Sequence, residues 1–204
     1  MLKKTRIAVL VSGGGTNLQA LIDAQNAGII KSGQIELVIS NNADAYALTR
    51  AQNAGIDTAV VSKKELGGDQ RVFEETLIEV LMSKGIELII LAGFMCILSA
   101  SFTSKYPKRI INVHPSLIPS FCGKGFYGLH VHEAALEYGV KVTGATVHFV
   151  NEIPDGGEII LQKAVEIKDG DTPEILQKRV MEEAEWKILP QAAEMVSAEL
   201  AEYI

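Results

Sequence analysis

The sequence alternates between short apolar runs rich in β-branched residues and longer segments with helical periodicity. Seven runs have the length of a buried strand: Ile7–Val11, Ile35–Ser40, Thr58–Val61, Leu88–Ala92, Ile110–His114, Ala145–Val150 and Ile159–Val165. Helical patterns separate the first six, near Asn17–Ala27, Ala45–Ala54, Gln70–Lys84, Ala100–Lys105 and His132–Tyr138. This alternation is typical of βαβ units, whose strands form a parallel sheet covered by helices.

The C-terminal third departs from this alternation. Only Asn151–Glu158 separates the last two runs, which is too short for a helical crossover and predicts an antiparallel hairpin at the edge of the sheet. A long helix is then expected after Thr172, with Pro173 at its first position and a kink at Pro190. The predicted fold class is therefore α/β, with a doubly wound, mostly parallel sheet and an antiparallel C-terminal edge hairpin.

Composition limits the kind of partner. The 204 residues suit a single domain over residues 1–204, and the formal charge of −6 argues against nucleic-acid binding. The apolar run after Lys3–Arg6 has only five residues, so it reads as a strand and not as a signal peptide or membrane span. Cys96 and Cys122 have no metal-binding spacing, and we expect two free thiols, no metal and a cytoplasmic location.

A glycine-rich loop lies between the first strand and the first helix. Glycines let the backbone approach a ligand closely, and the helix start offers unpaired N–H groups to a phosphate. The loop lacks the Gly-Lys-Ser/Thr of an NTPase, and Leu18 stands where a dinucleotide fingerprint has its third glycine. It therefore predicts a mononucleotide-like or sugar-phosphate ligand, the alternative being a plain tight turn. Its residues are Ser12, Gly13, Gly14, Gly15, Thr16 and Asn17.

A second polar segment ends the fifth predicted strand. Asn112 and His114 alternate along the strand, so both side chains point to one face at the carboxyl end, where open α/β sheets bind their ligands. An amide donor beside an imidazole suits acyl transfer through a tetrahedral intermediate. The alternative is a buried, hydrogen-bonded histidine.

Three further features are less specific. The Asp-Gly-Gly sequence at 155–157 alone is more typical of a turn. His148 lies within a predicted strand and is interpreted as a packing or structural residue. The loop Phe121–Tyr127 is either a mobile lid or an anchored surface loop, and the sequence leaves both open.

Three segments together resemble the phosphoribosylglycinamide formyltransferase family. They are LAGFMCILS (91–99), NVHPSLIP (112–119), and VHFV (147–150) running to Asp155-Gly156-Gly157. The resemblance extends over nearly the whole chain. It implies a Rossmann-like formyltransferase fold and an enzyme of purine (IMP) biosynthesis. The formyl group would pass from 10-formyltetrahydrofolate, a reduced folate, to glycinamide ribonucleotide, and we expect a monomer or weak homodimer.

The resemblance also implies roles for individual residues. The catalytic residues would be Asn112, His114 and Asp155. The nucleotide substrate would contact Ser12 to Asn17 and Glu185, with Glu183 as the alternative glutamate. The folate site would comprise Arg71, Met95, Cys96, Ile97, Leu98, Asn112, Asn151, Glu152, Ile153, Pro154 and Asp155. Residues 1–100 would form a nucleotide-binding half and residues 101–204 a folate-binding and catalytic half.

The implied mechanism is direct attack of the substrate amine on the formyl carbon. Asn112 and His114 would stabilise the oxyanion, and Asp155 would keep His114 protonated by raising its pKa. Three alternatives remain. A formyltetrahydrofolate deformylase would use water as acceptor and usually has an extra N-terminal domain. A methionyl-tRNA formyltransferase would need an RNA-binding domain. A non-catalytic nucleotide-binding module would need only the glycine loop.

Overall fold

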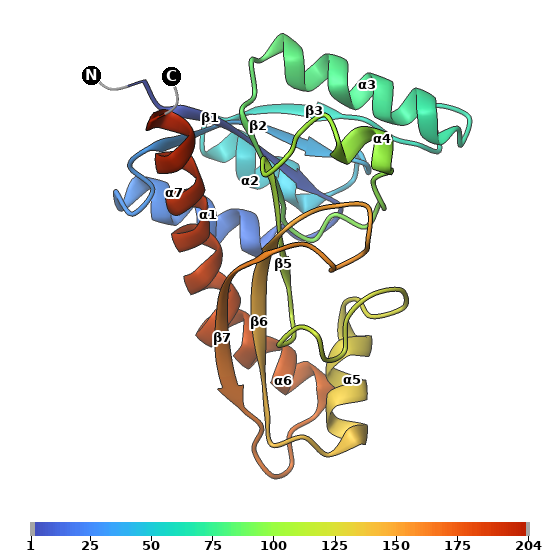
Figure 1. Cartoon of the computed structure of the whole chain (residues 1–204), viewed down its shortest axis with the longest axis vertical. Coiled ribbons are helices and arrows are strands. Elements are labelled where there is room, and N and C mark those ends of the chain that lie inside the picture. The colour runs from blue at the N-terminus through green and yellow to red at the C-terminus, as the bar shows by residue number, and fades with distance from the viewer. Residues whose placement is uncertain (1–2, 203–204) are drawn as a thin grey trace.

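The computed structural model describes residues 3–202 and contains one seven-stranded sheet (Figure 1). The spatial order is β3-β2-β1-β4-β5-β6-β7. The strands are β1 (Thr5–Val11), β2 (Gly33–Ser40), β3 (Asp57–Val60), β4 (Leu88–Leu91), β5 (Ile110–His114), β6 (Val142–Phe149) and β7 (Ile159–Glu166). The first five are parallel, whereas β6 is antiparallel to both β5 and β7. The predicted fold class and edge hairpin are confirmed.

Helices cover both faces of the sheet. They are α1 (Thr16–Asn26), α2 (Tyr46–Asn53), α3 (Gln70–Ser83), α4 (Ala100–Thr103), α5 (Leu129–Tyr138), α6 (Pro173–Val180) and α7 (Trp186–Glu202). Alternation along β1 divides the core: Ile7 and Val9 pack with residues of α1, α2, α6 and α7, while Ala8 and Leu10 pack with residues of α3 and α4.

The strand order reverses between β1 and β4, which lie side by side. Chain segments leave this point of an α/β sheet in opposite directions, so a crevice opens at the carboxyl ends of the two strands. The glycine loop follows β1, and the segment with Met95 follows β4. Both predicted binding segments therefore start at the same place.

Two helical boundaries differ from the sequence-based expectation. Helix α5 begins at Leu129, three residues before the predicted His132, directly after Gly128 in a positive-φ conformation. The C-terminal helix is interrupted by a π-helical turn, η1 (Met181–Glu185), where the Trp186 N–H bonds to the Met181 carbonyl. Pro190 lies inside α7. Because proline has no N–H, it cannot donate the helical hydrogen bond to the Trp186 carbonyl four residues earlier, and Trp186 lies beside this interruption.

Residues 3–202 contain no helix whose length and apolar character would allow it to cross a membrane.

Candidate active site

The site is built on a polar face shared by β5 and β6. Asn112 lies directly opposite His148, and His114 lies opposite Thr146. Directly opposed residues of antiparallel strands project from the same face with neighbouring Cβ atoms. His114 and His148 are buried, at 4% and 1% exposure. Two strands thus bring four polar side chains together in the interior.

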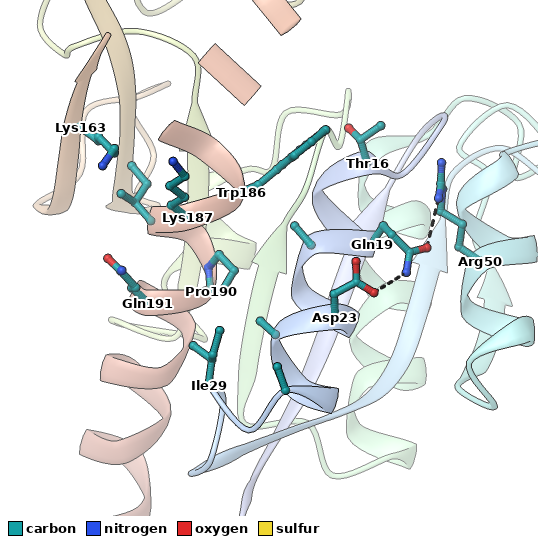
Figure 2. A pocket seen from close by; sticks show the side chains of 14 residues that line it. Thr16, Gln19, Asp23, Ile29, Arg50, Lys163, Trp186, Lys187, Pro190 and Gln191 are labelled. Atoms are coloured by element: carbon teal, nitrogen blue, oxygen red, sulfur yellow. Dashed lines mark hydrogen bonds between the residues drawn. The ribbon is translucent and has the colours of Figure 1, made fainter. Parts of the chain in front are cut away.

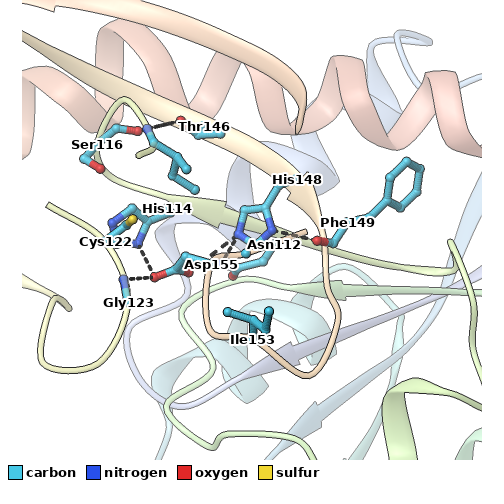
Figure 3. A network of polar contacts seen from close by, with 12 residues as sticks. Asn112, His114, Ser116, Cys122, Gly123, Thr146, His148, Phe149, Ile153 and Asp155 are labelled. Atoms are coloured by element: carbon cyan, nitrogen blue, oxygen red, sulfur yellow. Dashed lines mark hydrogen bonds and ion pairs between the residues drawn. The ribbon is translucent and has the colours of Figure 1, made fainter. Parts of the chain in front are cut away.

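Asp155 enters this cluster from the loop between β6 and β7. Within the loop, the Ile153 N–H donates to Asn151 Oδ1 at 2.9 Å and the Gly156 N–H donates to the Ile153 carbonyl at 2.9 Å. Asp155 itself has a φ of 56°. Its carboxylate lies between two imidazoles, with Oδ2 3.5 Å from His114 Nδ1 and Oδ1 3.6 Å from His148 Nε2 (Figure 3).

The segment after β5 closes over this cluster. The Phe121 carbonyl lies 2.8 Å from His114 Nε2, and the Gly123 N–H donates to Asp155 Oδ2 at 2.8 Å. Phe121 has a φ of 48°, which turns its backbone toward the histidine. From the sequence, the loop Phe121–Tyr127 is either a mobile lid or an anchored surface loop. The contacts of its first three residues fit an anchored surface loop.

Burial and contacts within the cluster oppose one another in setting the pKa values of His114 and Asp155. Burial lowers the pKa of His114, although the Asp155 carboxylate and the Phe121 carbonyl act to raise it. Burial also acts to raise the pKa of Asp155, but contacts with His148, His114 and the Gly123 N–H together lower it. The expectation that Asp155 keeps His114 protonated needs correction. The effect of Asp155 has the expected sign, but desolvation of the imidazolium outweighs it.

His148 is buried, as a packing or structural residue would be, but its ring also makes polar contacts with two predicted catalytic residues. Its Nε2 lies 3.3 Å from Asn112 Nδ2 and 3.6 Å from Asp155 Oδ1. The sequence held one signal: Thr146 and His148 alternate as polar residues along an otherwise buried strand, which puts both on one face. The pairing with Asn112 depends on the register of two strands separated by α5, which the sequence did not reveal.

A narrow cleft of about 130 Å³ opens beside the cluster. Most of the predicted folate-site residues line it together. Its walls are Leu91, Phe94, Cys96, Ile97, Leu98, Asn112, His148, Val150 and Asn151 to Asp155. Met95 is 57% exposed and is not among these residues, nor is Arg71, whose guanidinium lies 3.6 Å from Glu75 on the surface of α3. His114 also lies outside the cleft lining, behind Asp155.

The glycine loop runs from β1 into α1 as predicted. Gly15 has a φ of 72°, and a Cβ there would lie 2.6 Å from Ala47 Cβ, so this position requires glycine. A Cβ on Gly13 or Gly14 would meet no atom within 4 Å. No side chain caps the start of α1. Its first N–H groups are therefore available to an anion.

Glu185 on the π-helical turn reaches this loop. It is buried, and its Oε2 accepts a hydrogen bond from Asn17 Nδ2 at 2.6 Å. Burial raises the pKa of Glu185 to about 7, although the Asn17 hydrogen bond acts to lower it. Glu183, the other predicted glutamate, is exposed. Within residues 3–202, Asn17 Oδ1 is buried without a donor, so two oxygen acceptors lie together here.

The model of the formyl transferase family matches residues 5–193 of this chain. The chain belongs to the formyl transferase family.

Named relatives make the comparison more specific. Phosphoribosylglycinamide formyltransferase of Haemophilus influenzae is 43% identical over 91% of this chain and 84% of its own length. The trifunctional purine biosynthetic protein adenosine-3 of Homo sapiens is 48% identical over 96% of this chain, which spans only 19% of that protein. The crystal structure of glycinamide ribonucleotide transformylase 1 from Symbiobacterium toebii has a TM-score of 0.89 at 42% identity, covering 96% of this chain and 89% of that one.

This formyl transferase has a second, larger cavity of about 620 Å³ between α1 and α7 (Figure 2). Thr16, the first residue of α1, is one of its lining residues. Arg50, Lys163 and Lys187 line it, against one acidic residue, Asp23. Arg50 donates from Nε to the Gly14 carbonyl at 2.8 Å. The glycine loop therefore has positive charge beside it in a chain with net charge −6.

The formyl transferase site joins its two parts through one hydrogen bond. The Met95 N–H, next to the cleft, donates to Ser12 Oγ in the glycine loop at 2.8 Å. An anion held at the loop and an acyl donor in the cleft would meet at this junction. The polar cluster can then supply an amide donor from Asn112 and proton acceptors from Asp155 and His114.

Proposed function

We propose that this formyl transferase passes the formyl group of 10-formyltetrahydrofolate to the amine of N1-(5-phospho-D-ribosyl)glycinamide, a step of purine biosynthesis. The observation that carries the proposal is the hydrogen bond between Ser12 and Met95, because it joins a phosphate-type loop to a cleft bordered by an acid–base cluster. The phosphoribosylglycinamide formyltransferases among its relatives match it over most of their length.

For the acceptor, we propose that the loop from Ser12 to Asn17 binds the phosphate. The uncapped N–H groups of α1 and the cations Arg50, Lys163 and Lys187 favour an anion there. Glu185 and Asn17 Oδ1 would accept hydrogen bonds from the donor groups of the glycinamide ribonucleotide.

For the formyl donor, we propose the cleft between the segment after β4 and the Asn151–Asp155 loop. The apolar side chains of Ile97, Leu98 and Ile153 would contact the flat ring system of the folate. Met95 and Arg71, which do not line the cleft, are proposed for its outer margin, where the rest of the folate would leave the protein.

In the proposed reaction, the acceptor nitrogen forms a bond to the formyl carbon and the bond from that carbon to the folate nitrogen breaks. Asn112 donates a hydrogen bond to the oxyanion of the tetrahedral intermediate. Asp155, directly or through water, accepts the amine proton, and His114 shares it through the 3.5 Å contact with Asp155. Negative charge on the intermediate raises the pKa of His114, so a histidine that is neutral at rest becomes a better proton acceptor. The proton finally leaves on the folate nitrogen.

A formyltetrahydrofolate deformylase is the second candidate, since the same cluster could activate water. The glycine loop and the Asn17–Glu185 contact favour transfer, because a hydrolase has no phosphorylated acceptor to hold. A non-catalytic nucleotide-binding module would not need three polar groups within 4 Å of the Asp155 carboxylate.

The test is incubation of the protein with 10-formyltetrahydrofolate, with and without the glycinamide ribonucleotide. Formyl transfer should require the acceptor, and formate release in its absence should be slower by several orders of magnitude. Equal loss of formyl groups in both reactions would instead establish the deformylase.

Acceptor choice gives a separate prediction. Free glycinamide, without its ribose phosphate, should have a kcat/KM at least about 10³-fold lower, because remote binding energy orients the reacting centre. Both acceptors are compared at equal folate concentration. Similar rates would mean that the glycine loop plays no part in the reaction.

A further inference from the structure

We propose that His148 is a positioning residue, which orients the side-chain amide of Asn112 so that one N–H points at the formyl oxygen. This inference rests on the proposed function, because the formyl oxygen is the group that the amide would contact. His148 itself would hold no substrate atom and would act through Asn112.

The tautomer of His148 follows from its contact with the backbone. Its Nδ1 lies 2.7 Å from the carbonyl oxygen of Phe149. A carbonyl oxygen can only accept a hydrogen bond, so Nδ1 carries the proton. The neutral ring has a lone pair on Nε2, whereas a doubly protonated ring would donate from Nε2 to Asp155 Oδ1, 3.6 Å away. The proposed role of His148 requires the neutral ring.

The lone pair on His148 Nε2 faces the side-chain amide of Asn112. His148 Nε2 lies 3.3 Å from Asn112 Nδ2, so the amide donates one of its two N–H groups to the imidazole. This contact fixes which end of the amide faces His148. The second N–H of Nδ2 is then free to point into the cleft that both residues line. The opposite amide orientation would set a carbonyl oxygen against a lone pair and remove the oxyanion donor.

Strand pairing and a backbone hydrogen bond hold the His148 ring in place. His148 lies opposite Asn112 across the β5–β6 ladder, and the β6–β7 register shifts between Val147 and His148. Bulges of this kind re-aim side chains beside active sites. With 1% exposure and its Nδ1 tied to the backbone, the ring has little freedom to rotate. Asn112 gains an acceptor whose position is set by two strands.

Two substitutions separate positioning from packing. In His148→Gln, the amide oxygen can replace Nε2 as the acceptor for Asn112. In His148→Asn, the shorter side chain can replace only the Nδ1 contact to Phe149. We expect kcat to fall about 10²-fold in His148→Asn, the usual effect of losing an oxyanion donor, and to stay within about fivefold in His148→Gln. The KM values for both substrates should change little in either variant.

A double-mutant cycle tests whether His148 acts through Asn112. In an Asn112→Ala background, His148→Asn should lower kcat by less than about threefold, because the amide that it orients is already gone. Equal losses in His148→Asn and His148→Gln, or a further 10²-fold loss in the Asn112→Ala background, would overturn the proposal. An inactive parent protein would refute the proposed function and this inference with it.

The parent protein supplies a readout that does not depend on folding of the variants. Nitrogen-15 NMR of His148 distinguishes a protonated Nδ1 from an Nε2 that carries a lone pair. We expect Nδ1 to be protonated and Nε2 to couple to the Asn112 amide nitrogen. Protonation on Nε2 in the parent would contradict the assignment.

Discussion

Asp155 has a backbone conformation that few L residues adopt, and this decides which substitutions can test its chemistry. Its φ of 56° lies in the left-handed region, where Asn and Asp are the best tolerated residues after glycine. Strain at such a position persists when its surroundings hold it in place, as the hydrogen bonds of the Asn151–Gly157 loop do here. Alanine would disturb the turn as well as the charge, whereas asparagine suits the turn and keeps the side-chain shape while it removes the charge and replaces one acceptor oxygen by an NH2 group.

We therefore predict that Asp155→Asn lowers the single-turnover rate of formyl transfer about 10²–10⁴-fold, the range for losing a positioned acid–base group. It should also lower the pKa of His114 further, because Asp155 has the larger effect of the two groups that oppose burial there. The checks are the rate across pH and the thermal midpoint. An unchanged midpoint with a rate within about threefold of the parent would leave Asp155 as a turn former only.

Glu185 should make the stability of the protein depend on pH, since burial raises its pKa from 4.5 to about 7. Between these pH values the folded state binds more protons than the unfolded chain, so the free energy of unfolding falls as pH rises through this range. The shift corresponds to about 3 kcal/mol. Glu185→Gln should remove this pH dependence. The free energy of unfolding of the variant, relative to that of the parent, should therefore be higher at pH 8 than at pH 4.

Urea unfolding of both proteins at pH 4 and pH 8 measures the effect, and the KM for the nucleotide acceptor should rise in the variant. If parent and variant lost stability in parallel between these pH values, Glu185 would not be the group responsible. An unchanged KM would separate its structural effect from substrate binding.

At the scale of elements, the glycine loop combines two kinds of glycine. Gly15 is required by the backbone, because of its positive φ and the closeness of Ala47. Gly14 has no protein atom within 4 Å of a Cβ, so any need for glycine there comes from a ligand. A matched pair of substitutions follows from this difference.

Gly14→Val should leave the thermal midpoint nearly unchanged and raise the KM of the nucleotide acceptor at least about tenfold, with little change for the folate. Gly15→Val should lower the midpoint clearly, because a β-branched residue is strained at positive φ and would contact α2. Thermal scans and substrate kinetics on both variants test the contrast. Equal effects on both substrates in Gly14→Val would indicate misfolding of the loop.

Helix α3 supports the segment proposed to bind the folate in a way that the sequence did not reveal. Glu74 is buried and accepts hydrogen bonds from the Ser99 N–H at 2.6 Å and from the Ser99 hydroxyl. Gln70 donates to the Ile97 carbonyl at 3.1 Å. The segment that follows β4 is therefore held from α3, on the face of the sheet opposite α1.

For the whole molecule, alternation of apolar and polar residues was sufficient to predict the sheet and most helices. The sequence also predicted that the side chains of Asn112 and His114 point to the same face at the end of one strand, since the two residues are two positions apart. Contacts between distant segments could not be predicted. Three features depend on strand register and packing. They are the pairing of Asn112 with His148, the contact of Asn17 with Glu185, and the π-helical turn. The sign of the His114 pKa shift needed the burial of the ring, which no short motif records.

The two segments proposed to bind the substrates are linked by the hydrogen bond from the Met95 N–H to Ser12 Oγ. Ser12→Ala removes this acceptor. Met95 is 57% exposed, so water can replace the hydroxyl and the stability loss should stay below about 1 kcal/mol. The loss of mutual support should nevertheless raise the KM of both substrates, about threefold to tenfold, because small displacements of positioning segments have large effects on reaction geometry. The matched control is Ser104→Ala, an exposed serine that bonds only to its own helical turn. A change in KM for one substrate alone would show that the two segments are held independently, and the acceptor and the folate would then meet without this hydrogen bond.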